Sequence, residues 1–150
     1  MIKFEIKNRQ TGKKEAYEKE DISLMEAERF YELQDKQEKE NEKARKKAIE
    51  EIEKEHGSEN DFENQDFYFQ LVQQKYLQIV DAKKLRQMER EYFVSLFADQ
   101  GLTEDDILQS MSTKIYNKIS KEIFREISGE DEESNQDESE ELGKNGEQSQ

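Results

Sequence analysis

The fold of this chain is decided by residues 62–127, FENQDFYFQLVQQKYLQIVDAKKLRQMEREYFVSLFADQGLTEDDILQSMSTKIYNKISKEIFREI, which hold most of its large apolar side chains. These side chains recur at three- and four-residue steps, the spacing that gathers them on one face of a helix. They are Phe69, Val72, Tyr76 and Val80, then Leu85, Met88, Tyr92 and Leu96 with Phe93 and Phe97, then Ile107, Met111, Ile115, Ile119, Ile123 and Ile127. Such faces exclude water only by packing together, so residues 61–128 are expected to form a helical core.

Local signals divide this core into separate helices. A break or bend is expected near Asp81, and Gly101 should end the helix that follows it. Thr103 and Asp106 have the spacing of a capping box, so the next helix should begin at residue 104. A pause is expected at residues 110–113, before a last helix that runs to residue 127.

The first 22 residues have the pattern of a β-hairpin. Ile2, Phe4 and Ile6 alternate with charged residues, as in a half-buried strand, and a polar turn with Gly12 follows. Residues 14–20 supply the returning strand, with Tyr17 as its only large apolar side chain. Because a two-stranded hairpin is marginal alone, it must pack on a helix or on a partner.

Residues 23–56 are expected to form one long charged helix. Ser23 and Glu26 form a second capping-box pattern, which starts the helix at residue 24. Its first turns carry apolar residues that are expected to face the core: Leu24, Ala27, Phe30, Tyr31 and Leu33. Beyond them the sequence is rich in Glu and Lys, and only the side with Ala44, Ala48 and Ile52 can contact another element. A coiled coil is the alternative, although this apolar seam is short for one.

Charge is concentrated at the C-terminus of a chain whose 150 residues carry a net charge of -14. Residues 129–150 contain nine acidic residues and one lysine, for a net charge of -8. Such a segment cannot bury enough apolar surface to offset its ordering entropy, so we expect a disordered acidic tail. Its role is open between a solubility extension and a lure for basic segments of a partner.

No pattern typical of a catalytic, cofactor or metal site occurs. Cysteine is absent, His56 is the only histidine, and no phosphate loop or nucleophile motif is found. The acidic run at residues 104–106 is explained by the dipole of a helix N-terminus. The sequence has no apolar run long enough to cross a membrane and no signal peptide, so a cytosolic protein is expected. Its acidic surface would repel nucleic acid. We therefore expect a non-enzymatic protein without cofactors.

Aromatic residues provide the candidate site for binding another protein. Phe67, Tyr68 and Phe69 are consecutive, so they point around a helix and cannot all face its core side. Packing in the core explains most of this cluster, and an exposed member would be a typical interface anchor. The candidate partner-binding residues are Phe67, Tyr68, Phe69, Tyr76, Phe93 and Phe97.

The run FVSLFADQGLTEDDI at residues 93–107 resembles the central signature of tail assembly chaperones of long-tailed phages that infect Gram-positive bacteria. In that family an apolar helix ends in an Asp/Asn-Gln turn, followed by a threonine-capped acidic helix and an isoleucine-rich last helix. The N-terminal hairpin and the FYELQ stretch at residues 30–34 are also similar. Two positions depart from the family pattern: Leu102 replaces an aromatic residue, and Gln109-Ser110 replace a glycine. The charged residues 35–60 resemble an insertion.

The resemblance implies a non-enzymatic chaperone in the cytoplasm of the infected bacterium, absent from the finished virion. It would coat the tape measure protein, keep its hydrophobic helices soluble and help recruit tail tube subunits. The family also implies a longer product made by programmed frameshifting, and Gly143-Lys144-Asn145 can be encoded by a slippery A-AAA-AAY heptamer. The alternative function is an acidic DNA mimic that inhibits a nucleic acid-binding protein, although its excess acid lies mainly in the tail.

Overall fold

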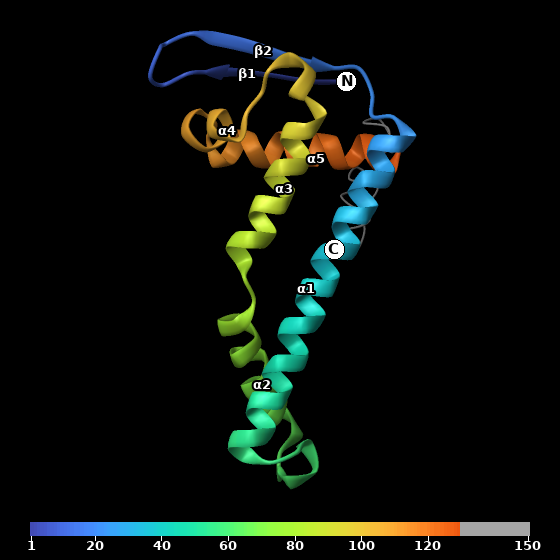
Figure 1. The fold of residues 1–150 in the computed structure, drawn as a ribbon, viewed down its shortest axis with the longest axis vertical. Helices are drawn as coiled ribbons and strands as arrows, with labels where there is room; N and C mark the ends of the chain where they lie inside the picture. The colour runs from blue at the N-terminus through green and yellow to red at the C-terminus, as the bar shows by residue number, and fades with distance from the viewer. Residues whose placement is uncertain (130–150) are drawn as a thin grey trace, which may run out of the picture. The chain divides into compact units, whose positions relative to one another are not determined.

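The computed structural model describes residues 1–129 and is mainly helical, with a two-stranded hairpin followed by five α-helices. Strands β1 (Ile2–Lys7) and β2 (Lys14–Lys19) precede α1 (Leu24–His56), α2 (Gln65–Ile79), α3 (Ala82–Leu96), α4 (Glu104–Ser110) and α5 (Thr113–Ser128) (Figure 1). Single turns of 3-10 helix, η1 (Glu59–Asp61) and η2 (Ala98–Gln100), lie before α2 and after α3. The predicted fold class is confirmed for this part of the chain. The predicted acidic tail lies outside the described residues from position 130 onward.

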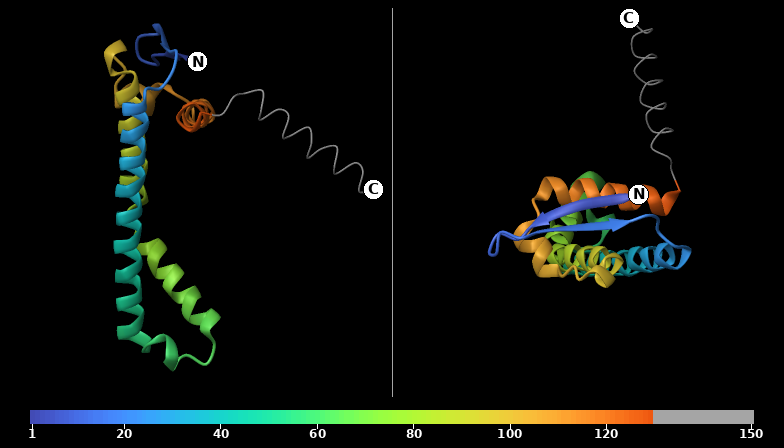
Figure 2. Two further views of the ribbon diagram at one scale, coloured as in Figure 1. Left: turned by 90° about the vertical axis from the view of Figure 1, so that its right-hand side faces the viewer. Right: turned by 90° about the horizontal axis from the view of Figure 1, so that it is seen from above.

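The chain divides into two units. The first unit combines Met1–Ala27 with the chain from Phe93 onward, and the second is the continuous segment Glu28–Tyr92. The first unit therefore contains the hairpin, η2, α4 and α5, whereas the second contains α2 with most of α1 and α3 (Figures 1 and 2). Segments from the two ends of the sequence thus share one core.

Strand β1 buries one face, as its alternating sequence predicts, and β2 adds Tyr17 to this face. Strand β1 pairs antiparallel with β2 so that Phe4 lies opposite Tyr17, and their rings stack 5.2 Å apart. Ile2 and Ile6 are buried on the same face as Phe4. The turn is closed by the Asn8 side chain, which accepts hydrogen bonds from two backbone amides, and Gly12 adopts a φ of 73° there.

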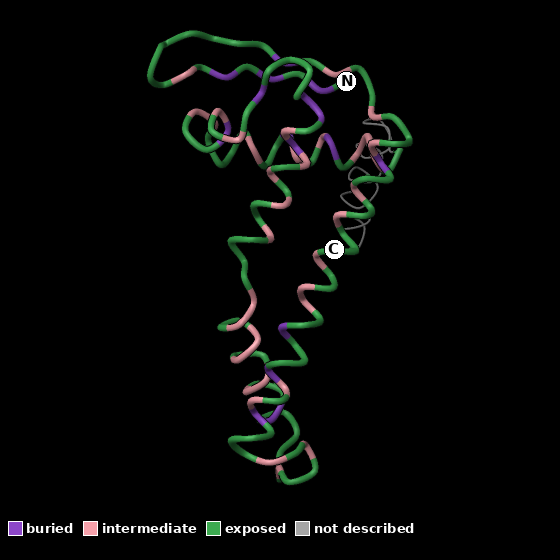
Figure 3. Tube along the Cα trace, in the orientation of Figure 1, coloured by how far each residue is buried: buried purple, intermediate pink, exposed green. Residues whose placement is uncertain are grey.

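The buried face of the hairpin is covered by the last turn of α3 and by α4 and α5. Phe97 has no exposed surface, and its ring meets that of Phe4 edge to face at 5.0 Å. Phe93 contacts Phe4 at 5.7 Å and stacks on Tyr116 of α5 at 5.3 Å. The buried segments of β1, α3 and α5 are purple in Figure 3. This aromatic cluster is the centre of the first unit.

The isoleucine stripe of α4 and α5 is buried only in part. Ile107, Ile119 and Ile123 are buried, but Ile115 is 43% exposed. The helix is interrupted between Ser110 and Thr113, as the predicted pause requires, so four-residue steps counted across the break do not follow one face. Within α5, each four-residue step also drifts by about 40° around the helix. Ile115 therefore lies at the edge of the buried face.

The turn after α3 is fixed to the hairpin by a side-chain amide. Gln100 donates a hydrogen bond to the Glu18 carbonyl at 2.8 Å and accepts one from the Glu18 amide at 3.0 Å. The glutamine thus satisfies both backbone groups of one residue on β2, as a neighbouring strand would. Gly101 follows with a φ of 87°, and Thr103 and Asp106 form the predicted capping box of α4.

The start of α1 confirms the predicted cap and corrects the predicted core residues. Ser23 and Glu26 exchange the two hydrogen bonds of a capping box, and Lys19 lies 2.8 Å from the Glu26 carboxylate. However, Leu24 is 88% exposed, because side chains lean toward the helix N-terminus and no earlier turn covers the first residue. Tyr31 is also exposed, and only Ala27 among the five expected residues is fully buried.

In the second unit, polar contacts supplement a small apolar interior. Ala44, Ala48 and Ile52 of α1 are buried, as predicted for the apolar side of this helix. The predicted break near Asp81 separates α2 from α3, and its carboxylate accepts a hydrogen bond from the Lys84 amide. Helix α3 is joined to α1 by Lys84 with Glu40 at 3.1 Å and by Gln37 with the Leu85 carbonyl at 3.3 Å.

We expect Phe97→Ala to reduce the free energy of unfolding by about 3–5 kcal/mol, the usual cost of deleting a buried aromatic ring. Chemical denaturation of the full chain measures this change. Phe124→Ala removes a ring that is 51% exposed in the same unit, and it should cost much less. Equal losses for the two variants would contradict the placement of Phe97 at the centre of this core.

We also expect the Glu26 carboxylate to contribute acid-sensitive stability. Burial alone would raise the pKa of Glu26, but hydrogen bonds from Lys19 and Ser23 lower it below its ordinary value of 4.5. A lowered folded-state pKa contributes stability above pH 4.5 that is lost as the pH falls further. Glu26→Gln should therefore cost about 1 kcal/mol or less at pH 7, and the difference should vanish in acid.

Denaturation at several pH values measures this dependence, with exposed Glu28→Gln on the same helix as the matched control. A cost of Glu26→Gln that stays constant with pH would show that the ion pair is not formed.

Candidate functional site

The six aromatic residues predicted to bind a partner form a buried and an exposed group. Phe93 and Phe97 lie in the core of the first unit, with 2% and 0% of their surface exposed, and Tyr68 is 5% exposed in the second unit. Tyr76 is half-buried. Phe67 and Phe69 are 52% and 54% exposed. Of the six, only these two present most of the side chain at the surface, so they remain the candidates for binding.

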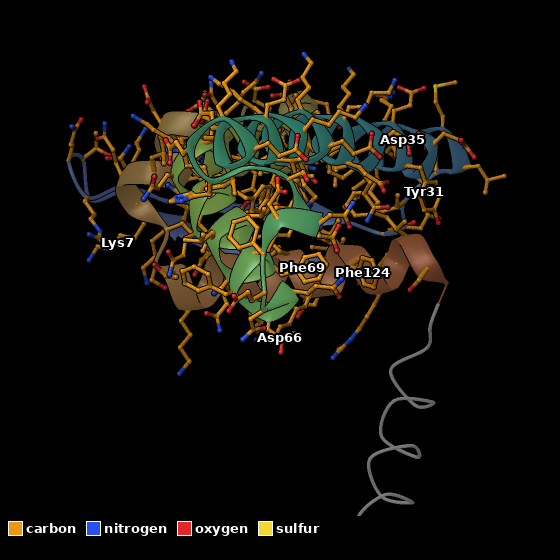
Figure 4. The ribbon with its side chains drawn as sticks, turned by 90° about the horizontal axis from the view of Figure 1, so that it is seen from below. Lys7, Tyr31, Asp35, Asp66, Phe69 and Phe124 are labelled. Atoms are coloured by element: carbon orange, nitrogen blue, oxygen red, sulfur yellow. The ribbon has the colours of Figure 1, made fainter. Side chains whose placement is uncertain are left out.

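Phe67 and Phe69 are exposed because Tyr68 between them occupies the inner side of α2. Successive residues of a helix differ by about 100°, so both neighbours of a buried residue turn outward. The Phe62 ring lies 5.1 Å from Tyr68 and 6.2 Å from Phe67, and the Phe69 ring lies 5.5 Å from Tyr68. Figure 4 shows Phe69 standing out from α2. The cluster is thus buried at Tyr68 and open at its two ends.

Leu77 extends this exposed apolar surface along α2. It is 63% exposed and lies eight residues after Phe69, with Gln73 halfway between them. Four-residue spacing places these three side chains along one side of the helix. Leu77 was not among the predicted binding residues, because it lies outside the predicted stripe of Phe69, Val72, Tyr76 and Val80. The spacing of eight residues between Phe69 and Leu77, about two helical turns, could have indicated that the two lie near one another on the helix. We define the α2 surface as Phe67, Phe69 and Leu77.

Helix α2 is held by a cap at its N-terminus and by contacts with α1. The Asn64 side chain caps its N-terminus by accepting a hydrogen bond from the Asp66 amide. Lys75 lies 3.3 Å from Glu51 and 3.6 Å from Glu55 of α1. The Tyr76 hydroxyl lies 3.1 Å from the Asn41 side chain, and the Arg45 guanidinium lies over the Tyr76 ring. These contacts engage Tyr76 with α1, whereas its neighbour Leu77 remains exposed.

Packing and ion pairing shift the pKa values of Tyr68 and Lys75 of α2. Burial raises the pKa of Tyr68, with a further contribution from the nearby Glu53 and Glu59 carboxylates. A hydrogen bond with Glu51, together with the charge of Glu55, raises the pKa of Lys75. Both shifts are explained by packing and ion pairing. The α2 surface is thus apolar and has acidic neighbours.

Three other features of residues 1–129 were candidate sites: groups of metal ligands, His56, and the acidic residues that start α4. Within this range, no group of three or more potential metal ligands comes together. His56, at the end of α1, is about half exposed and lies 3.8 Å from Glu55 and beside the Phe62 ring. Across the same residues, no helix is long and apolar enough to cross a membrane. The acidic residues that start α4 serve its cap, where Asp106 bonds the Thr103 amide.

Comparison with known proteins identifies a family. Neither the curated proteins nor the solved structures include a match to this chain. A protein family described as phage tail chaperone protein matches residues 1–144, which is nearly the whole sequence. The match includes all described residues and most of the acidic segment. The chain therefore belongs to the phage tail chaperone protein family.

Proposed function

We propose that this chain binds the tape measure protein of a long-tailed phage and helps recruit tail tube subunits to it. It acts by contact and not by catalysis, in the cytoplasm of an infected Gram-positive bacterium, and it is left out of the finished virion. Membership of the phage tail chaperone family supports a role in tail assembly. The partners and the host are inferred from the sequence resemblance.

The observation that carries this proposal is the α2 surface. Phe67, Phe69 and Leu77 are each more than half exposed on a helix that polar contacts of Lys75 and Tyr76 join to α1. Exposed aromatic rings are frequent anchors at protein interfaces. An amphipathic helix binds by laying its apolar face on an apolar surface of its partner. A tape measure protein with long apolar helical faces would supply the complementary surface.

The net charge of -14 suits a protein that keeps an apolar partner in solution. Chains far from neutrality repel one another, so complexes that carry this charge resist further association. The α2 surface itself has acidic neighbours in Glu59, Glu63 and Asp66. Bound partner segments would therefore be surrounded by negative charge that discourages their aggregation.

We expect the full chain, when produced together with the tape measure protein of its phage, to keep that protein soluble and to purify with it. The triple variant F67A/F69A/L77A should lose this activity. Removing one anchor commonly costs about 2 kcal/mol or more, which exceeds tenfold in affinity. The soluble fraction and the dissociation constant of the purified complex measure the effect.

The matched control is L24A/M25A/L108A, which also removes three apolar side chains that are each more than half exposed. It should retain binding. Leu77→Glu gives a second variant, at a residue that is 63% exposed. Thermal melting verifies that each variant folds. If the folded α2 variants bind as tightly as the unaltered chain, the α2 surface is not the binding site. Failure of the unaltered chain to bind would reject the tape measure protein as partner.

The resemblance also predicts a longer product made by frameshifting near Gly143-Lys144-Asn145. The gene should then contain an A-AAA-AAY heptamer at these codons. Mass spectrometry of infected cells should detect a peptide that crosses the junction. Synonymous changes that interrupt the heptamer should abolish the longer product and leave the amount of the shorter one nearly unchanged.

A further inference from the structure

Helix α5 carries a basic stripe that the proposed function does not use. Lys114, Lys118 and Lys121 are exposed and Arg125 is half-buried, and they follow one another at three- or four-residue steps. At 100° per residue, these four side chains fall within a sector of about 60°. Ile119 and Ile123 lie on the opposite, buried side of the helix. We call these four residues the α5 basic stripe.

The α5 basic stripe differs from the other lysine-rich surface in having few neutralising neighbours on its own helix. The lysines of α1 alternate with glutamates such as Glu38, Glu42 and Glu50. Helix α5 has only Glu122 and Glu126, and the Glu126 carboxylate lies 2.9 Å from the N-terminal ammonium group. Within residues 1–129, none of the four stripe residues forms an ion pair. The stripe is therefore a positive surface on a strongly acidic protein.

The surface along the stripe is shallowly hollowed. Two open hollows on α5 are lined by the four cations of the stripe, with Asn117, Ser120 and Phe124 and the single carboxylate Glu122. Phe124 is 51% exposed on this helix (Figure 4). A shallow, open, positively charged surface suits an extended acidic chain better than a small enclosed ligand.

The most acidic segment of the sequence begins directly after this helix. Gly129 ends α5 with a φ of 73°, which turns the chain away from the helix axis. Residues 130–141 then contain eight acidic residues and no basic one. The stripe from Lys114 to Arg125 extends about 16 Å, whereas twelve residues of chain can span about 40 Å. The acidic segment is therefore long enough to return along the whole stripe.

We propose that residues 130–141 bind back onto the α5 basic stripe. Attachment through Gly129 makes the encounter intramolecular, with an effective concentration in the millimolar range for a short connection. Contacts between exposed charges are individually weak, so the bound segment exchanges readily and depends on salt. While it is bound, its carboxylates and the α5 basic stripe are both withheld from other proteins.

The absence of cysteine allows a direct test in the full chain. A nitroxide label attached at Ser139→Cys should broaden the backbone amide signals of residues 114–125 at low salt, relative to the reduced label. The broadening should be lost at 1 M salt, where the Debye length is only about 3 Å. It should also be lost in K114Q/K118Q/K121Q/R125Q, which removes the stripe but keeps the acidic segment.

The control K39Q/K43Q/K46Q/K47Q removes four exposed lysines from α1 and changes the net charge equally. It should leave the broadening of the α5 signals intact. Signal dispersion in the same spectra verifies that both variants fold. Absence of broadening over α5 at low salt, or its persistence in the stripe variant, would overturn the proposal.

A mixing experiment separates binding within one chain from binding between copies. Labelled protein without isotope enrichment is added to isotope-enriched protein without the nitroxide. Unchanged α5 signals in this mixture, together with broadening in the singly labelled chain, support binding within one molecule. Equal broadening in the mixture would show that the acidic segment binds a second copy and would overturn the intramolecular proposal.

Discussion

The need to cover one face of a two-stranded hairpin is the constraint on which the first unit depends. Two strands cannot form an interior, so Ile2, Phe4 and Ile6 remain in water unless helices cover them. The ring of Phe97, with no exposed surface, supplies the centre of that cover. Because Phe97 is distant in sequence, the hairpin can be completed only when the later helices have been placed. The core thus joins the beginning of the chain to its last described helices.

The same constraint explains the turn that characterises the sequence signature. Gln100 bonds both backbone groups of Glu18, so the turn after α3 satisfies an edge of the hairpin that would otherwise depend on water. Gly101 then allows the chain to reverse, and Thr103 starts α4. The short polar turn between α3 and α4 therefore has a structural role, because it contacts the N-terminal strands. Its residue types are explained by architecture without reference to a binding site.

The second unit is built differently, and this difference leaves large apolar side chains at its surface. Its interior relies on small side chains of α1 and on Tyr68, with ion pairs such as Lys75 to Glu51 between the helices. Few large apolar residues are consumed in this interior. The aromatic residues of α2 therefore exceed what packing requires, and two of them remain at the surface. An exposed apolar surface and a modest core follow from the same distribution of side chains.

The sequence by itself determined the elements and most of their ends, because these depend on local patterns. Strand alternation, the capping boxes at Ser23 and Thr103, and the glycine after α3 each act within a few residues. Only the tertiary structure decided which apolar residues are buried, since burial depends on the element that packs opposite. For this reason Phe93 and Phe97 became core residues while Phe67 and Phe69 stayed exposed, although all four are aromatic residues on predicted helices. Leu77 could be recognised as exposed only after Tyr68, Lys75 and Tyr76 had shown which side of α2 faces α1.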